Sequence, residues 1–99
     1  MNIEFVTLKS NVSLIFEQTS KSDNEVFGNA IYLYARQKNN SDIWEYPNYL
    51  GKNLPLFRLE NISIRREANP LEKNMFKRIS SGKEITTKQK EMLRKKFKK

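Results

Sequence analysis

The chain of 99 residues contains no cysteine and no histidine. Without cysteine no disulfide framework can form, and without either residue the usual thiolate and imidazole ligands of zinc sites are missing. The absence of histidine also removes the side chain that most readily exchanges protons near neutral pH. An enzyme built from this sequence would have to work with Glu, Lys, Arg and Tyr. We therefore expect a protein without enzymatic activity, metal ion or cofactor.

Long apolar runs are also missing. No stretch approaches the ~18 residues that a membrane-spanning helix needs, and the mean hydropathy is −0.77. The first residues, Met1-Asn2-Ile3-Glu4-Phe5, lack the positively charged segment that opens a secretory signal. These features predict a cytoplasmic protein that has no contact with a membrane.

Positive charge is present in excess, and it is concentrated in the last third of the chain. Residues 1–64 hold six basic and seven acidic side chains, whereas residues 65–99 hold thirteen basic and four acidic ones. A local excess of this size is more than solubility requires, and it predicts an anionic partner. Nucleic acid is the first candidate, because phosphate neutralisation rewards the number of Lys and Arg residues more than their exact placement.

The near-neutral part, residues 2–66, predicts an antiparallel sheet of four to five strands. Residues 3–8 and 12–16 alternate apolar and polar side chains around a Lys9-Ser10-Asn11 turn, which indicates a hairpin. The polar residues 18–25 predict a loop. Residues 26–37 have the strongest strand pattern of the chain.

The second half of the sheet is less regular. A short strand is predicted over residues 43–46, where it stops before Pro47. Residues 48–55 are expected to be irregular because they contain Gly51 and Pro55. A β pattern resumes over residues 56–66, with a turn or bulge at Glu60-Asn61.

After Ala68 the apolar period changes to that of a helix. Asn69 at the N-cap, followed by Pro70 and by Glu72 at the third helical position, is a good helix start. An apolar arc then carries Leu71, Met75, Phe76 and Ile79 up to a stop at Gly82.

A second helix start follows, in which Thr86 and Gln89 form a capping box. In this helix one face carries Met92, Leu93 and Phe97. Two helices, over 70–81 and 87–98, should therefore form a C-terminal hairpin. We predict an α+β fold in a single domain over residues 1–99, β-rich up to residue 66 and helical and strongly basic from residue 67.

If the helical hairpin packs its apolar side on the sheet, its outer side presents a strip of cations. The candidate nucleic-acid-binding residues are Arg65, Arg66, Lys73, Lys77, Lys88, Lys90, Arg94, Lys95, Lys98 and Lys99. The loop over residues 80–85 is longer than the turn of a helix-turn-helix motif. The sequence therefore predicts contact with the phosphate backbone and little sequence preference.

Two groups of aromatic residues add further candidate sites. Tyr32, Tyr34, Arg36 and Lys38 lie on one side of the predicted strand, which is typical of a surface that stacks single-stranded bases. The alternative, which we favour from the sequence, is that helices bury this side. The second group comprises Trp44, Tyr46 and Tyr49. It would anchor a protein partner if exposed and would fill the core if buried, and burial is again favoured.

We therefore expect a non-enzymatic accessory protein that binds RNA or single-stranded DNA. One alternative is a phage or mobile-element protein that inhibits a host protein by binding an acidic surface. Asn, Lys and Ile supply 32 of the 99 residues, which suits an AT-rich genome of that kind. A second alternative is a small ribonuclease toxin, similar to RelE in size, charge and mixed α/β content. Such toxins generally begin with helices, whereas this chain begins with strands.

Overall fold

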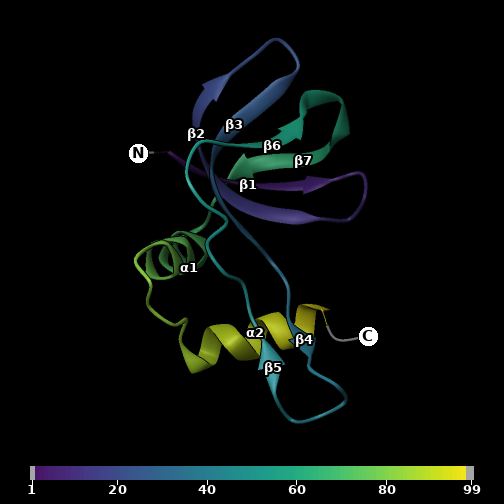
Figure 1. The fold of residues 1–99 in the computed structure, drawn as a ribbon, viewed down its shortest axis with the longest axis vertical. Coiled ribbons are helices and arrows are strands. Elements are labelled where there is room, and N and C mark those ends of the chain that lie inside the picture. The colour runs from purple at the N-terminus through teal and green to yellow at the C-terminus, as the bar shows by residue number, and fades with distance from the viewer. Residues whose placement is uncertain (1, 98–99) are drawn as a thin grey trace.

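The computed structural model describes residues 2–97. An antiparallel five-stranded sheet is followed by two helices, which confirms the predicted α+β class (Figure 1). The sheet consists of β1 (Ile3–Leu8), β2 (Ser13–Lys21), β3 (Glu25–Tyr32), β6 (Leu54–Arg58) and β7 (Ile62–Glu67). The helices are α1 (Pro70–Ser80) and α2 (Thr87–Phe97). A separate two-stranded ribbon, β4 (Arg36–Gln37) with β5 (Trp44–Glu45), projects past α2.

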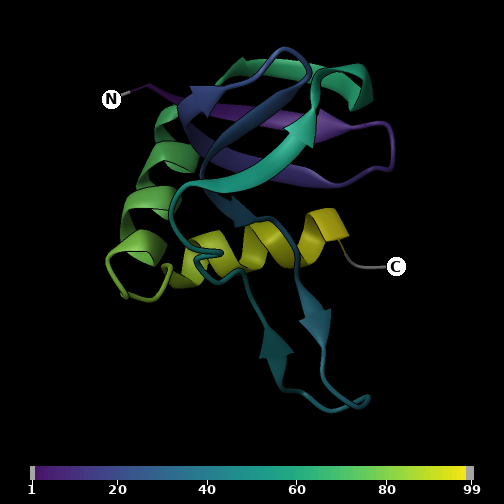
Figure 2. The same ribbon diagram turned by 45° about the horizontal axis from the view of Figure 1, so that its top comes forward.

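The five-stranded sheet is strongly curled. Its strand order is β6-β3-β2-β1-β7, so the two edge strands are neighbours in the chain, joined only by the 3₁₀ turn η1 (Leu59–Asn61). Three residues span at most about 10 Å, whereas the edges of a flat five-stranded sheet are about 19 Å apart. The sheet therefore bends until its edges approach each other, as Figures 1 and 2 show.

The curled sheet has an apolar cluster on each side, because successive residues of a strand point to opposite faces. The concave side encloses Val6, Leu14, Phe16, Val26, Ala30 and Phe57. The convex side packs against the helices and brings together Ile3, Phe5, Ile15, Ile31, Met75, Phe76, Ile79 and Leu93. The helices thus cover the side of the sheet opposite to the enclosed cluster.

Gly28 permits the close approach of β2 and β3 where the sheet bends. It faces Gln18, next to a shift in the β2–β3 register. A Cβ atom at this position would lie 2.0 Å from the backbone oxygen of Glu17. Only glycine fits such a contact without displacing the neighbouring strand.

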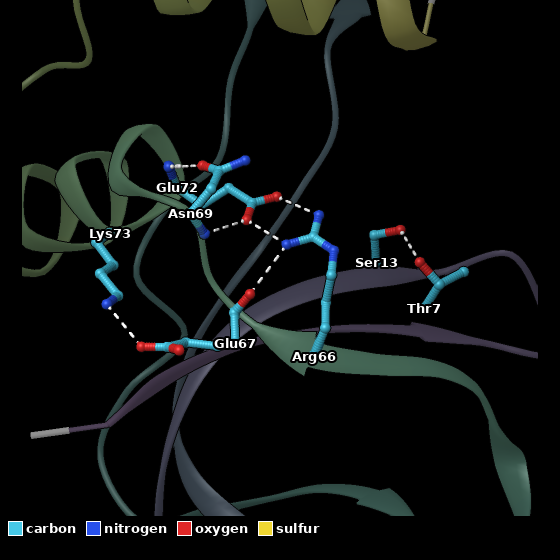
Figure 3. Close-up of polar contacts among 7 residues, drawn as sticks. All are labelled: Thr7, Ser13, Arg66, Glu67, Asn69, Glu72 and Lys73. Atoms are coloured by element: carbon cyan, nitrogen blue, oxygen red, sulfur yellow. Dashed lines mark hydrogen bonds and ion pairs between the residues drawn. The ribbon is translucent and has the colours of Figure 1, made fainter.

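A buried carboxylate joins the last strand to the first helix (Figure 3). The guanidinium of Arg66 donates to both carboxylate oxygens of Glu72, at 2.8 and 2.9 Å. The predicted capping box is present, since Asn69 and Glu72 each accept the other's backbone N–H at 2.8 Å. Burial raises the pKa of Glu72, but the hydrogen bonds from Arg66 and Asn69 outweigh it and hold the pKa below its ordinary value.

The start of α1 differs from the prediction in one respect. Leu71 was expected in the apolar arc, but it is 38% exposed, whereas Glu72 is buried. On a helical wheel Leu71 lies at the edge of that arc, and Glu72, about 100° further round, lies within it. The inward position is therefore taken by a carboxylate whose charge is compensated by Arg66.

Three strand boundaries also differ. The predicted loop over residues 18–25 is wrong, because β2 continues to Lys21 and β3 begins at Glu25. Both faces of the chain are exposed there, which removes the alternation that marks a strand. The predicted strand over residues 26–37 is divided, because residues 33–35 leave the sheet and join β3 to β4. Finally, β6 begins within the expected irregular segment, and as an edge strand it tolerates Pro55.

The turn between the helices is formed as predicted around Gly82. Gly82 has a φ of +77°, and Lys83 and Gly82 donate to the carbonyls of Arg78 and Ile79. These are the two hydrogen bonds of a Schellman motif. Figure 2 shows that the chain then changes direction, so that α2 crosses beneath the sheet rather than running along α1.

The second helix starts and is anchored as its sequence predicts. Thr86 and Gln89 form the predicted capping box, with hydrogen bonds of 2.9 and 3.1 Å. Gln89 also donates to Asn74 of α1 at 2.8 Å, and Leu93 is fully buried in the convex cluster. Within residues 2–97, neither of the helices is long and apolar enough to cross a membrane.

The Arg66–Glu72 pair predicts a specific dependence of stability on pH. Because the pKa of Glu72 is lowered by folding, its stabilisation is present above the ordinary value of 4.5 and is lost as the pH falls through the native value. Glu72→Gln should therefore unfold more easily than the wild type near neutral pH, by about 2 kcal/mol. The difference should shrink as the pH falls below 4.5.

Urea denaturation at a series of pH values measures this effect. Glu67→Gln is the matched control, because Glu67 pairs with Lys73 at 3.0 Å but is largely exposed, and its loss should change stability little. A constant difference between Glu72→Gln and the wild type down to low pH would contradict the assignment.

Leu93 should hold α2 in place. Leu93→Ala is expected to lower the free energy of unfolding by about 2–5 kcal/mol. Trp44, the only tryptophan, packs against the convex cluster, so loosening of α2 should shift its fluorescence to longer wavelength. Lys95→Ala, on the exposed side of the same helix, serves as the control and should leave both quantities unchanged. Equal effects of the two substitutions would show that Leu93 does not anchor the helix.

Candidate nucleic-acid interface

The outer side of α2 is a cationic surface. Because Gln89 and Leu93 point inward, the helical period turns Lys88 and Lys95 outward, and both are exposed. In the described part of the chain, neither lysine forms an ion pair. The one acidic residue of α2, Glu91, is likewise without an ion-pair partner there. We call this surface, formed by Lys88 and Lys95, the outer face of α2.

Two further cations of α2 lie on aromatic rings of the β4–β5 region. The Arg94 guanidinium lies 5.8 Å from the ring centre of Trp44, and the Lys90 ammonium lies 5.4 Å from that of Tyr46. Lys90 is also 3.7 Å from Glu84. The aromatic surfaces support the stems and charged ends of these side chains on the side of α2 that faces the β4–β5 region.

Three of the predicted binding residues are engaged within the protein. Arg65 pairs with Glu4 at 2.9 Å, donates to Gln18 and lies over the ring of Phe16. Arg66 binds Glu72 and stacks on Phe5, 4.1 Å from the ring centre. Lys73 pairs with Glu67. These contacts give the three side chains structural roles, and they lie apart from the outer face of α2.

The remaining predicted cations divide into two kinds. Lys77 of α1 is exposed and forms no ion pair with any described residue. Lys98 and Lys99 lie outside the described residues. Of the ten predicted cations, Lys88, Lys90, Arg94 and Lys95 are therefore the ones that the structure groups on α2.

An aromatic groove of about 710 Å³ lies beside α2. It is lined by Tyr32, Tyr34, Ala35, Arg36, Gln37, Trp44 and Phe97. The rings of Tyr32 and Tyr34 are 5.9 Å apart, and the guanidinium of Arg36 lies 5.6 Å from the ring centre of Tyr34. Tyr32 is 37% exposed. The expectation that helices bury this side is not met at Tyr32, while Tyr34 is half-buried, because the helices mainly cover the opposite side, where Ile31 and Leu33 are buried.

The second aromatic group is divided between two hollows. Trp44 lines the aromatic groove, whereas Tyr46 and Tyr49 line a neighbouring hollow of about 630 Å³ together with Lys90. All three rings are half-buried against the convex cluster. Lys38 lies at the exposed tip of the β4–β5 ribbon and lines neither hollow.

The β4–β5 ribbon is held by an ion pair at its base. Arg36 donates to one carboxylate oxygen of Glu45 through two nitrogens, at 3.2 and 2.6 Å. These hydrogen bonds raise the pKa of Arg36 and lower that of Glu45, so that both remain charged. Glu45 compensates much of the charge of Arg36, whereas Arg94 of α2, over Trp44, forms no ion pair with any described residue.

Sequence reasoning missed Phe97 as a groove residue. Phe97 shares a helical face with Met92 and Leu93, which indicates a core position. In the structure it is half-buried, because the last turn of α2 extends to the β4–β5 ribbon and Phe97 faces the groove there. The neighbouring residues carried a signal for this position. Phe97 lies between two lysines, which is typical of the margin of a core, whereas the buried Leu93 follows the apolar Met92.

Comparison with protein-family models, with curated proteins and with solved structures finds no match for the chain. The geometry of α2 and of the aromatic groove is therefore the basis for inferring a function.

Proposed function

We propose that this chain is a non-enzymatic accessory protein that binds nucleic acid, and that the outer face of α2 contacts the phosphate backbone of RNA or single-stranded DNA. One observation carries the proposal. Lys88 and Lys95 project from a helix fixed at Leu93, and no acidic side chain of the described residues pairs with them.

The arrangement suits phosphates rather than base edges. Lys88 and Lys95 are seven residues apart, about 10 Å along the helix axis. Each lysine is a flexible point charge with no fixed fork of donors, and such side chains bind phosphate without reading sequence. Arg94, over Trp44, places a further cation beside the aromatic groove, and Lys90, over Tyr46, places one beside the neighbouring hollow.

An acidic surface of a host protein would meet the same cations, as in the alternative of a phage inhibitor. The aromatic groove favours nucleic acid, because rings beside cations are the combination with which proteins hold single strands. The acidic protein is therefore an outcome of the experiments rather than a second proposal.

Binding should weaken steeply with salt. Four phosphate contacts, by Lys88, Lys90, Arg94 and Lys95, would give a slope of about −3 in a plot of log affinity against log salt, or about 50-fold weaker binding at roughly 200 mM than at 50 mM. Fluorescence anisotropy with a labelled single-stranded oligonucleotide measures this slope. If no oligonucleotide binds at the lower salt concentration, the proposal fails. Recovery of one stoichiometric protein from a nuclease-treated lysate would then support the inhibitor instead.

Charge removal on α2 should change the slope, whereas the same removal elsewhere should not. Lys88→Gln with Lys95→Gln should reduce the slope by about 1.4, since each lost phosphate contact to a single strand removes about 0.7. The matched control is Lys9→Gln with Lys21→Gln, which removes the same charge from exposed positions at the ends of β1 and β2. Equal slopes for the two double variants would show that net charge, and not the outer face of α2, determines binding.

A further inference from the structure

The aromatic groove is open to solvent, and the backbone that forms each of its two walls is held by contacts within the protein. Beyond β3, Leu33 and Ala35 are buried in the convex cluster, and the Leu33 N–H donates to the Ser13 carbonyl at 3.0 Å. The side chains of Tyr32 and Tyr34, which alternate with them, are therefore held on the opposite side, toward the groove. Little ordering is needed when a ligand enters, because the rings are already in place.

The other wall is fixed as well. Trp44 is paired with Gln37 in the β4–β5 ribbon. At the next paired position of the ribbon, Arg36 and Glu45 form an ion pair. Arg94 covers the ring of Trp44 from α2. Phe97 completes the wall from the end of the same helix. The groove thus has aromatic side chains from three segments. Three of its rings each have a cation over them: Arg36 at Tyr34, Arg94 at Trp44 and Lys96 at Phe97.

The lining indicates the chemistry of the occupant. Aromatic walls favour a flat ring with a π face. The Arg94 guanidinium, which forms no ion pair with a described carboxylate, favours an anion attached to that ring. An unpaired nucleotide has both parts. In an acidic protein segment the charge and any aromatic ring belong to separate side chains, and the bases of an intact duplex are already stacked on each other. The volume of about 710 Å³ lies within the range of small-ligand sites, roughly 300–1,000 Å³.

We propose that the aromatic groove stacks an unpaired base of the strand whose phosphates lie on the outer face of α2. This inference rests on the proposed function and makes it more specific. The protein then prefers single-stranded nucleic acid over duplex, and the preference comes from Tyr32, Tyr34 and Trp44 rather than from the lysines. Base identity matters little, because every base has a π face.

Trp44 is the natural reporter for this inference, because it is the only tryptophan of the chain and lines the groove. The experiment compares an oligo-deoxyadenylate strand, an abasic strand of equal length and a duplex, all at low salt. A base stacked in the groove quenches indole fluorescence, so the adenylate strand should quench Trp44. The abasic strand should bind about tenfold more weakly, without quenching, because each stacked base contributes a factor of this order.

Substitutions at Tyr32 provide the matched pair, because this ring is partly exposed and its replacement leaves the core intact. Tyr32→Leu should remove most of the difference between the adenylate and abasic strands. Tyr32→Phe keeps the stacking surface and should retain the difference. If Tyr32→Leu and Tyr32→Phe reduce the affinity difference between the two strands by the same amount, the ring has no role in stacking. The only change that the two variants have in common is the loss of the hydroxyl.

The outcomes separate this inference from the proposed function. If the abasic strand binds as tightly as the adenylate strand and Trp44 is not quenched by either, the groove holds no base, while backbone binding by α2 stands. If the duplex quenches Trp44 as strongly as the adenylate strand and binds with the same affinity, the groove assignment is also overturned. If neither strand binds at low salt, the proposed function itself fails. Tight adenylate binding that quenches Trp44 and is sensitive to Tyr32→Leu supports both.

Discussion

The contact of Arg66 with Glu72 determines where the helices lie on the sheet. Arg66 belongs to the edge strand β7 and Glu72 to the first turn of α1, so one pair of side chains fixes the helix to the sheet immediately after the chain leaves it. The guanidinium also stacks on Phe5 of β1, and Lys96 of α2 lies over the same ring at 5.1 Å. Both helices are therefore positioned by contacts that converge on one phenylalanine. Together with the burial of Leu93 and the Gln89–Asn74 hydrogen bond, these contacts set the direction of α2 and so the position of the cationic surface.

The aromatic groove results from a second constraint, the alternation of side chains beyond the end of β3. The chain leaves the sheet after Tyr32, yet its next apolar residues, Leu33 and Ala35, still pack inward on the helices. The tyrosines and Arg36 are turned outward as a consequence. Because α2 supplies both Phe97 to the groove and Arg94 to its margin, the helix links the aromatic and the cationic surfaces. A single packed helix thus contributes to the two features on which the proposed function rests.

Local patterns in the sequence predicted the parts of the fold that local interactions create. The capping residues Asn69 and Thr86 and the stop at Gly82 all form as expected, since each depends on residues within one helical turn. Contacts between distant residues were not predictable in this way. Arg65 pairs with Glu4, 61 positions away, and no local pattern distinguishes it from a cation that faces solvent. The meeting of Trp44 with Tyr32 and Phe97 has the same cause, because three separate segments assemble the groove. The lysines of α2 were predictable because the helix that carries them is amphipathic.

The proline in β6 limits the pairing capacity of one open edge of the sheet. Unpaired sheet edges are templates on which a further strand can add. In β6 the open edge lacks one donor, because Pro55 has no N–H. In β7 the other edge carries Arg65, Arg66 and Glu67 in succession, and η1 draws the two edges toward each other. Both edges of the sheet therefore carry features that disfavour the addition of a further strand.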